Sequence, residues 1–385
     1  MGRKKKQPVE EGASKKKSTT DDLLWDKAEK LLSSEYGKDV LQTFEQLTSK
    51  NVEGISTGSL ALDYAINPKL GGMPRGRVIE IYGPHSGGKT TLALGVCANA
   101  TANKLKVVFI DAEASLTPEL IKNSGIDTEY FRCTTEMDGR ITANLAETLM
   151  KTGKVGVVVV DSLPAWRPIP DPKKGKDEAD FTRPQMAYKS SFHGEVLPRL
   201  ASVARQYNVI LLLLNQVRQN ISGYGNPSKP FGGEVVKHTD SVRIKCTGNA
   251  SSSNERIQDS DGNLVGQYTT CVVDKNKTAL PMGVARLPLF LGRGVNPYME
   301  VATLAQQVGI VTGASGWFKW ADSDDVIAHG IDNFTQTLFD DDDLYKKLRK
   351  EVISRLGLTY PKDKIIINSF HDENLKKYSD LVEDK

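Results

Sequence analysis

Residues 83–90 read Gly83-Pro84-His85-Ser86-Gly87-Gly88-Lys89-Thr90 and match the phosphate-loop pattern G-x-x-x-x-G-K-[ST] at every fixed position. The apolar run before them, residues 78–82, predicts a buried strand, and residues 91–103, which begin with Thr91, predict a helix. Glycines in such a turn let backbone N–H groups point at phosphate oxygens, and the helix N-terminus adds a favourable dipole. An ordinary glycine-rich turn fits less well, because the whole pattern and both flanks agree. We therefore expect Lys89 to reach the β- and γ-phosphates of a nucleotide and the Thr90 hydroxyl to ligate Mg²⁺.

Acidic residues follow two more predicted strands. Residues 106–110 lead into an acidic turn that contains Glu113, and residues 155–160 lead directly to Asp161. In an open parallel sheet the carboxyl ends of the strands border the ligand crevice. An aliphatic strand that closes on aspartate, downstream of a phosphate loop, is the Walker B arrangement. Asp161 is therefore predicted to hold the hydration shell of the Mg²⁺ ion.

Two long polar stretches, residues 167–180 and 218–233, interrupt this pattern. Long segments of this kind in a compact domain are usually functional or disordered. Between them the sequence predicts a helix at about residues 184–207 and a strand at residues 209–214. Gln216 follows that strand, where its amide can bond a γ-phosphate or the attacking water and sense hydrolysis.

Strands that alternate with helices predict an α/β fold with a mostly parallel, doubly wound sheet. Later strands are expected at residues 241–246, 268–274 and 285–290, with an extended hairpin over the turn-rich residues 248–266. Beyond residue 297 the pattern predicts a small α+β lobe. The expected organisation is a basic disordered tail, a helical arm, a nucleotide-binding core, a small lobe and an acidic tail, at residues 1–20, 21–53, 54–296, 297–370 and 371–385.

The helical arm is predicted from Asp21 to about Lys50, with Thr20 and Asp21 as its N-cap. Two alternatives remain open for it: a helix that packs on its own domain, or an arm that docks on a neighbouring subunit. The basic tail before it is expected to be a solvated arm, and contact with DNA is the alternative.

Composition excludes several classes of protein. The chain of 385 residues is 39% hydrophobic and 26% charged, and no apolar run nears the roughly 18 residues of a membrane helix. The basic first residues lack the apolar region of a secretory signal, so we expect a cytoplasmic protein without a membrane partner. The cysteines are scattered and predict buried thiols in a reducing compartment, without a metal site or disulfides, at Cys97, Cys133, Cys246 and Cys271.

These residues together resemble the bacterial-type RecA recombinase family. The resemblance covers about residues 54–317 and continues more weakly to residue 356. It is carried by motifs in the family's order and approximate spacing: Thr57-Gly58-Ser59-Leu60, Glu80-Ile81-Tyr82-Gly83-Pro84, Phe109-Ile110-Asp111-Ala112-Glu113, Val160-Asp161-Ser162, Asn215-Gln216-Val217-Arg218, Gly225-Asn226-Pro227, Gly232-Gly233 and Lys275-Asn276-Lys277. The resemblance implies a RecA-type DNA-dependent ATPase that uses ATP and Mg²⁺. Such a protein polymerises on single-stranded DNA as a helical filament and catalyses homologous pairing and strand exchange with double-stranded DNA.

The resemblance also implies roles for single residues. Glu113 is expected to be the general base or water-positioning carboxylate, and Gln216 to couple the γ-phosphate to the loop after it. Lys275 and Lys277 are expected to reach across a subunit interface to the neighbour's γ-phosphate, in the manner of an arginine finger. A structural carboxylate at Glu113, and lysines on a solvated strand edge, are the open alternatives.

The two polar stretches correspond to the DNA-facing loops of the family, at about residues 167–183 and 218–233. Basic side chains there suit phosphate contacts, the amide of Asn220 can donate hydrogen bonds, and Tyr224 suits stacking at a base step, although a surface tyrosine is the alternative. The predicted DNA-binding residues are Lys173, Lys174, Lys176, Arg183, Arg218, Asn220, Tyr224, Gly225, Asn226, Gly232, Gly233 and Arg243.

The sequence departs from the family at several positions. Leu120 and Leu291 stand where aromatic residues usually contact adenine, so adenine is expected to be held by apolar contact alone. His85 replaces a common acid in the loop, and His238 replaces an aromatic residue at the subunit contact. Two other functions compete on the same motifs: a hexameric ring helicase or motor, and a P-loop kinase that does not act on DNA. The placement of the lysine pair and of the small lobe favours a filament.

Overall fold

The computed structural model describes residues 20–37, 40–44, 53–169, 185–219, 228–231, 233–248, 252–258, 262–314, 316–323 and 325–361. The chain divides into two units, residues 1–51 and 52–385. In the first unit, helix α1 (Thr20–Tyr36) is shorter than the predicted helix, because Gly37 follows it with a left-handed φ of +100°. Large apolar side chains of α1 are exposed, among them Leu24 and Trp25. The predicted N-cap side chains lie outside the described residues.

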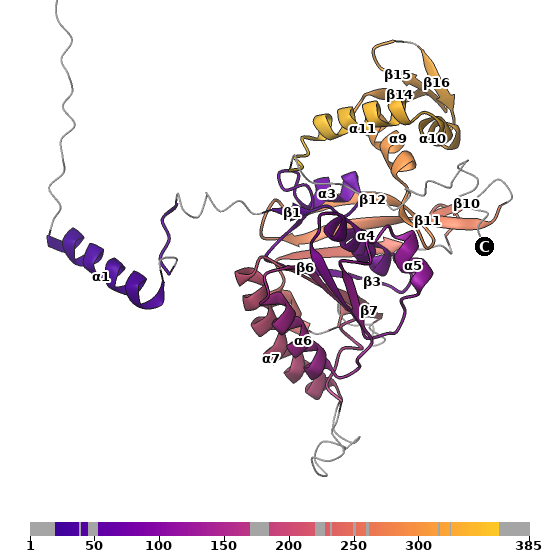
Figure 1. The fold of residues 1–385 in the computed structure, drawn as a ribbon. Coiled ribbons are helices and arrows are strands. Elements are labelled where there is room, and N and C mark those ends of the chain that lie inside the picture. The colour runs from indigo at the N-terminus through magenta and orange to yellow at the C-terminus, as the bar shows by residue number, and fades with distance from the viewer. Residues whose placement is uncertain are drawn as a thin grey trace, which may run out of the picture. The chain divides into compact units, whose positions relative to one another are not determined.

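A mixed sheet forms the centre of the second unit (Figure 1). Its parallel part confirms the predicted sheet and consists, in spatial order, of β9 (Val242–Gly248), β3 (Val78–Gly83), β7 (Ile210–Gln219), β6 (Val155–Asp161), β4 (Lys106–Asp111) and β5 (Phe131–Thr134). Antiparallel strands extend it beyond β9: β11 (Leu264–Asn276), β12 (Gly283–Phe290) and β13 (Gly294–Val295). The predicted hairpin is present as β10 (Arg256–Gln258), which pairs with β11.

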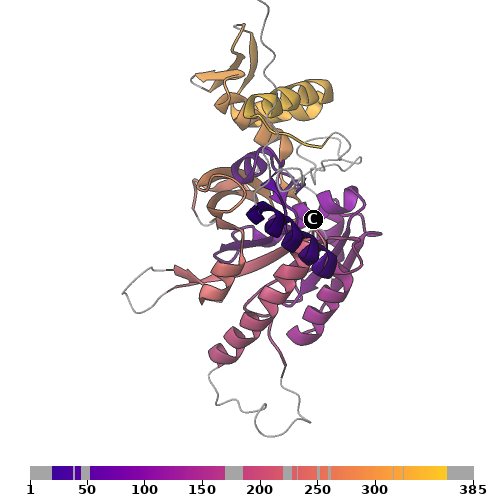
Figure 2. The same cartoon turned by 90° about the vertical axis from the view of Figure 1, so that its left-hand side faces the viewer.

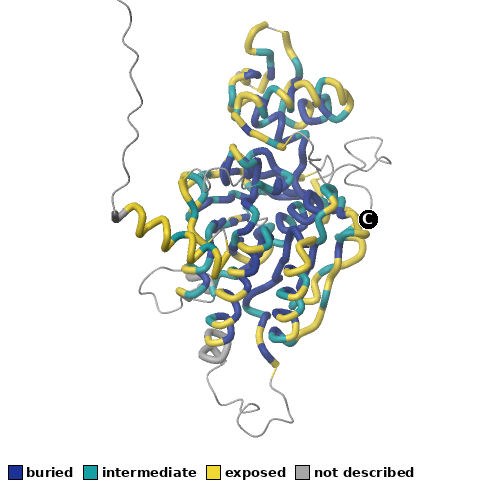
Figure 3. Tube along the Cα trace, turned by 60° about the vertical axis from the view of Figure 1, so that its left-hand side comes forward, coloured by how far each residue is buried: buried dark blue, intermediate teal, exposed yellow. Residues whose placement is uncertain are grey.

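Helices cover both faces of the parallel strands because successive strand residues point to opposite sides. Ile79 and Ile81 pack with α4 (Lys89–Ala102), whereas Val78 packs on the other face with α6 (Gly139–Met150) and α7 (Gln185–Gln206). Figure 1 and Figure 2 show α6 and α7 side by side along the sheet. The interior between these layers is the buried, dark blue part of Figure 3. Strand β5, helix α6 and the short helix α5 (Pro118–Asn123) were not predicted.

Two predictions on this part of the chain were wrong in detail. Strand β7 continues through Gln216 to Gln219, because residues 217–219 pair with β8 (Ser228–Pro230) in an antiparallel hairpin. Cys133 is exposed, because edge strand β5 has a partner on one side only, whereas the other three cysteines are buried. In the described part of the chain, no helix has the length and hydropathy to cross a bilayer.

The small C-terminal lobe confirms the predicted α+β character. It contains α9 (Pro297–Gln307), β14 (Val311–Ala314), β15 (Trp317–Trp320), β16 (Val326–His329), α10 (Ile331–Asp340) and α11 (Asp342–Leu356). The three strands, which were not predicted, form an antiparallel sheet. Phe334 and Leu338 of α10 pack with Leu348 and Val352 of α11 in a core separate from that of the large sheet.

Helix α3 (Leu60–Ile66) joins the lobe to the large sheet. Glu300 of α9 accepts hydrogen bonds from Ser59 Oγ and from the backbone N–H of Leu60 at 3.1 Å, so it caps α3. The segment after α11 returns to α3, where Tyr360 Oη donates to Asp63 Oδ2 at 2.9 Å.

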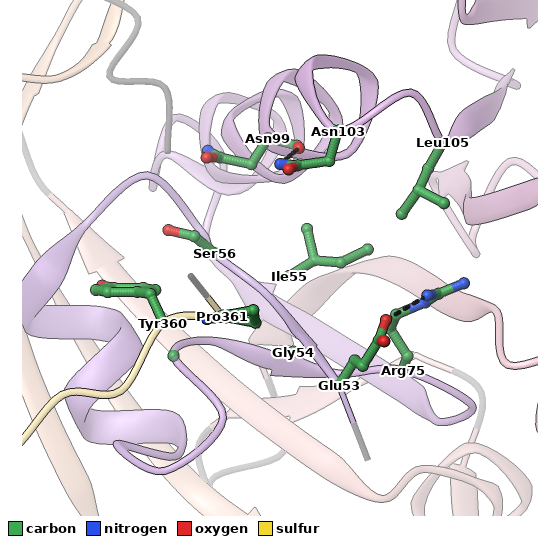
Figure 4. A pocket seen from close by; sticks show the side chains of 11 residues that line it. Glu53, Gly54, Ile55, Ser56, Arg75, Asn99, Asn103, Leu105, Tyr360 and Pro361 are labelled. Carbon is green, nitrogen blue, oxygen red and sulfur yellow. Dashed lines mark hydrogen bonds and ion pairs between the residues drawn. The ribbon is translucent and has the colours of Figure 1, made fainter. Parts of the chain in front are cut away.

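Figure 4 shows Tyr360 and Pro361 near Ser56 in the β1 (Gly54–Ile55) and β2 (Met73–Pro74) region. The small cavity between them measures about 20 Å³. That volume suits about one water molecule. The cavity is therefore part of the packing of this joint and not a ligand site.

The buried Glu300 predicts a pH-dependent joint. Burial raises the pKa of Glu300 to about 7, so the folded chain keeps a proton that the unfolded chain releases near pH 4.5. The contribution of this group to the free energy of unfolding is full below that pH and is lost as the pH rises through 7. The free energy of unfolding in urea should fall as the pH rises from about 5.5 to about 8. That fall should be about 2 kcal/mol smaller in Glu300→Gln than in the native chain. The control is Glu351→Gln in α11, where the side chain of Glu351 is 40% exposed. Equal losses in the native chain and in Glu300→Gln would contradict the prediction.

Candidate nucleotide-binding site

The predicted phosphate loop lies between β3 and α4 at the carboxyl edge of the parallel strands. Gly88 is the N-cap of α4 with a left-handed φ of +88°, and a Cβ there would lie 2.3 Å from Leu289 Cδ1. A Cβ at Gly83 would lie 2.0 Å from the backbone oxygen of Cys246 on β9. The backbone of β9 therefore leaves no room for a side chain at Gly83, whereas at Gly88 the left-handed φ is what favours glycine.

This close approach makes Gly83 a sensitive position. The methyl group of Gly83→Ala meets backbone, which cannot rotate away, so the substitution should destabilise the chain by about 3 kcal/mol and weaken nucleotide binding. The matched control is Gly194→Ala in α7, where a Cβ meets nothing within 4 Å. The control should be neutral or stabilising by up to about 1 kcal/mol. Thermal unfolding of both variants checks this, and equal melting temperatures would contradict it.

The charged side chains of the loop face the same edge. Lys89 Nζ donates to the backbone oxygen of Pro84 at 2.6 Å and lies 3.3 Å from that of Gly83. Burial lowers the pKa of the Lys89 ammonium, and the negative charges of Asp161 and Glu113 oppose that shift. The ammonium therefore sits over the loop and close to two carboxylates.

Thr90 and Asp161, the two predicted magnesium residues, are in contact. Thr90 Oγ1 donates to Asp161 Oδ2 at 2.8 Å, and Asp161 is 4% exposed. Burial, together with the charges of Glu113 and Asp111, raises the pKa of Asp161 to about 6, while the Thr90 hydrogen bond opposes the shift. Within the described ranges no group of three or more acids, histidines or cysteines could enclose a metal ion. The oxygen pair fits a hard cation that keeps most of its water or phosphate ligands.

The structure brings Glu113 and Gln216 together, although 103 residues separate them. Gln216 Nε2 donates to Glu113 Oε1 at 2.8 Å, and Ser162 Oγ donates to the same oxygen. Asp111 has a different task, because its carboxylate accepts from the backbone N–H of Ser115 and Leu116 and shapes the turn that carries Glu113. Gln216 pairs with Gly83 in the sheet, so the carboxylate and the amide lie level with the start of the phosphate loop.

An open cleft of about 390 Å³ lies beside the loop, which is large enough for a nucleotide base and sugar. It is lined by Ser86, Gly87, Gly88, Lys89, Thr90, Thr91, Gln267, Leu289, Phe290, Leu291 and Gly292. Leu291 is thus at the cleft, but Leu120 packs against the core of the α4 face. Gln267, which the sequence did not single out, donates to the backbone oxygen of Ser86 at 2.6 Å. No sequence motif marks Gln267, because it is one polar residue on an ordinary strand.

The two predicted trans-acting lysines differ in their surroundings. Lys277 is exposed, whereas Lys275 Nζ is bound to Asp240 of its own chain. Both lie near the end of β11. Their action on a neighbouring subunit stays a prediction.

The described residues reach only part of the predicted DNA-binding set. Outside the described residues lie the side chain of Arg218 and all of Lys173, Lys174, Lys176, Arg183, Asn220, Tyr224, Gly225, Asn226 and Gly232. Gly233 is the first residue of α8 (Gly233–Thr239). Arg243 is 9% exposed, and its Nε lies 2.6 Å from Glu80 Oε2 and 3.1 Å from Asp240 Oδ2. The structure therefore places Arg243 in a buried ion network, and its contact with DNA stays a prediction.

A phosphate loop beside strand-end carboxylates, on a mostly parallel sheet that continues into antiparallel strands, defines a P-loop ATPase. A profile described as the RecA N-terminal domain matches residues 24–296. Curated relatives named Protein RecA match most of the chain. Those of a Thermus thermophilus strain and of Thermus aquaticus are each 32% identical, over 85% and 89% of this chain and over 93% and 96% of their own lengths. That of Ruminococcus albus is 32% identical over 83% of this chain and 77% of its own length.

The chain belongs to the RecA family. It is accordingly an ATP-dependent recombinase and a DNA-dependent ATPase, as the motifs implied. Nothing in the comparisons favours the helicase alternative.

Proposed function

We propose that this chain hydrolyses ATP at a site shared by two adjacent copies, and that the shared nucleotide holds a helical filament on DNA. The observation that carries the hydrolytic part of the proposal is the contact between Glu113 and Gln216 at the level of Gly83, and the exposed Lys277 directly after β11 is free to face a second copy. It sets a carboxylate within one hydrogen bond of an amide whose strand leads into the second DNA-facing loop. Loss of the γ-phosphate on hydrolysis would alter the contacts of Glu113 and Gln216, and strand β7 would transmit that change to the loop.

Each residue has a distinct task in this proposal. Lys89 and the loop N–H groups bind the β- and γ-phosphates, and Thr90 and Asp161 hold Mg²⁺, which neutralises phosphate charge when it is bound. Glu113 orients the attacking water and accepts its proton, because its Oε1 is already positioned by Ser162 and Gln216. Lys275 and Lys277 approach the same γ-phosphate from the neighbouring copy and stabilise its developing charge.

The proposed partners are single-stranded and double-stranded DNA. Basic residues of the two loops would bind phosphates, and base pairing between the DNA strands would supply the sequence specificity. Affinity for single-stranded DNA should then fall with rising salt in proportion to the phosphates contacted. Turnover of ATP that does not respond to single-stranded DNA would contradict this assignment, and closed rings in electron micrographs would contradict the filament.

A mixing experiment tests the shared site. Lys89→Ala lacks one half of the site, and a double variant, Lys275→Ala with Lys277→Ala, lacks the other half, so neither should turn over ATP alone. In an equal mixture about a quarter of the head-to-tail interfaces combine two intact halves, so about a quarter of the native turnover should return. Inactivity of the mixture, while electron micrographs show mixed filaments, would mean that the site lies within one copy.

A further inference from the structure

A buried ionic cluster joins β3, β9 and β11 to the end of α8. Glu80 of β3 and Asp240, which follows α8, are both 0% exposed, and Arg243 of β9 lies between them. Lys275 of β11 approaches Asp240 from the other side. Two acids and two basic residues therefore share one site below the surface, where an ion pair is screened little by solvent.

Lys275 is fully occupied within this cluster. Its ammonium donates to Asp240 Oδ1, to the backbone oxygen of Lys237, and to the backbone oxygen of Asp240 at 2.9 Å. Those three bonds use all the donors that a lysine has. The two carbonyls belong to the C-terminal end of α8, where the helix dipole favours a cation. In this arrangement Lys275 has no donor left for a phosphate.

The cluster is also connected to the nucleotide site. Glu80 Oε1 accepts from Asn215 Nδ2 at 2.6 Å, and Asn215 Oδ1 accepts from the backbone N–H of Gln216 at 2.8 Å. Asn215 Nδ2 also donates to the backbone oxygen of Phe231, where the second loop returns to the sheet. Hydrogen bonds and ion pairs thus run from Glu113 through Glu80 and Arg243 to Asp240.

We infer that Asp240 is a positioning residue that withholds Lys275 from the neighbouring copy's triphosphate, and that protonation of Asp240 or displacement of α8 releases the lysine. The inference rests on the proposed role of Lys275 at the shared site. It explains why the two lysines of one motif lie in different environments. Lys277 stays exposed and available, whereas Lys275 must exchange an internal carboxylate for an external phosphate.

The charges around Asp240 set the pH range of this exchange. Burial, together with the charge of Glu80, raises the pKa of Asp240 to about 7, while Lys275 and Arg243 oppose the shift. His238 of α8 is exposed and faces Glu234, as does Lys237. Asp240 is therefore the buried group of this cluster that gains a proton as the pH falls through 7, and the hold on Lys275 weakens in the same direction.

Amine labelling of the nucleotide-free chain tests the inference without any turnover. A brief pulse of acetic anhydride, read by fragment mass spectrometry, gives the ratio of acetylation at Lys275 to that at Lys277. Asp240→Asn keeps the shape of the side chain and removes its charge, so the ratio should rise about fivefold to tenfold near pH 8. In the native chain the ratio should rise as the pH falls to about 6, and in Asp240→Asn it should stay flat.

Two further variants make the reading specific. Asp274→Asn removes a neighbouring carboxylate that accepts from Tyr82 Oη and does not bind Lys275, so it should leave the ratio unchanged. Asp240→Glu retains the charge and should restore most of the low ratio. If Asp240→Asn does not fold, the pH series on the native chain carries the test. An equal labelling rate at the two lysines of the native chain, or an unchanged ratio in folded Asp240→Asn, would overturn the inference.

Turnover separates this inference from the proposed function. With single-stranded DNA present, Asp240→Asn should lower the KM for ATP about threefold at pH 8 with kcat nearly unchanged, because Lys275 no longer has to leave a carboxylate. A changed labelling ratio with an unchanged KM would overturn the positioning role and leave the ATPase intact. Failure of the mixing experiment would instead refute the shared site, and this inference with it.

Discussion

Lys89→Ala is expected to weaken ATP binding at least about a hundredfold and to abolish turnover that depends on DNA. The ammonium supplies a charge-assisted contact to the phosphates from within the loop, and it lies beside Asp161 and Glu113, whose negative charges would otherwise repel a nucleotide. Loss of the lysine therefore removes an attraction and leaves two carboxylates without a nearby cation. Equilibrium binding of a fluorescent ATP analogue measures the affinity, and phosphate release with and without single-stranded DNA measures turnover.

The control for that variant is Lys151→Ala. Lys151 is exposed, follows α6 and pairs with Glu147 at 2.6 Å, so its removal changes the net charge equally. Exposed pairs of this kind contribute about 0–1 kcal/mol to stability, and nucleotide affinity should not change. If Lys89→Ala retained turnover stimulated by single-stranded DNA, the loop could not be the triphosphate site.

Glu113→Gln is expected to bind ATP with near-native affinity and to lower turnover by about 10²- to 10⁴-fold. The amide oxygen can still accept from Ser162 and Gln216, so the local structure should survive, but the group that accepts the proton of water is gone. With ATP present the variant should remain on single-stranded DNA as a filament, because the phosphate contacts are not removed by hydrolysis. Fluorescence anisotropy of labelled DNA, alongside phosphate release, measures both effects.

Glu119→Gln serves as the matched control for the acid. Glu119 is exposed in the first turn of α5, close in sequence to Glu113, and has no described contact with Gln216. Its turnover should stay within about twofold of the native value. Native turnover in Glu113→Gln would show that another group activates the water.

Local patterns predicted the parts of the fold that depend on short segments. The phosphate loop, its strand and helix, Glu113 after β4 and Asp161 at the end of β6 are each encoded within a dozen residues. Apolar runs therefore sufficed to predict the parallel strands other than β5. The short edge strand β5 and the three strands of the C-terminal lobe carry much weaker patterns, and these were missed.

Contacts between distant residues were beyond reach of the sequence. Asn215 and Gln216 were predicted after a strand, but pairing with β8 extends β7 past them. The family resemblance assigned Arg243 to DNA binding. Its ion pairs with Glu80 and Asp240 were not predicted, because these residues lie on separate elements. The contact between Asp240 and Lys275 forms because the end of α8 packs against β11, although the two residues are 35 positions apart in the sequence. No local sequence pattern predicts that contact.

The pairing of Glu80 with Arg243 across β3 and β9 has a consequence for assembly of the sheet. Val242 and Ile244, on either side of Arg243, face the opposite, apolar layer with Ile79 and Ile81. If β9 paired one residue out of register, the Arg243 guanidinium would point into that apolar layer. The buried carboxylate of Glu80 would then lose its counter-ion. An out-of-register sheet would thus be less stable than the native one, and the correct register is favoured during folding before a nucleotide binds.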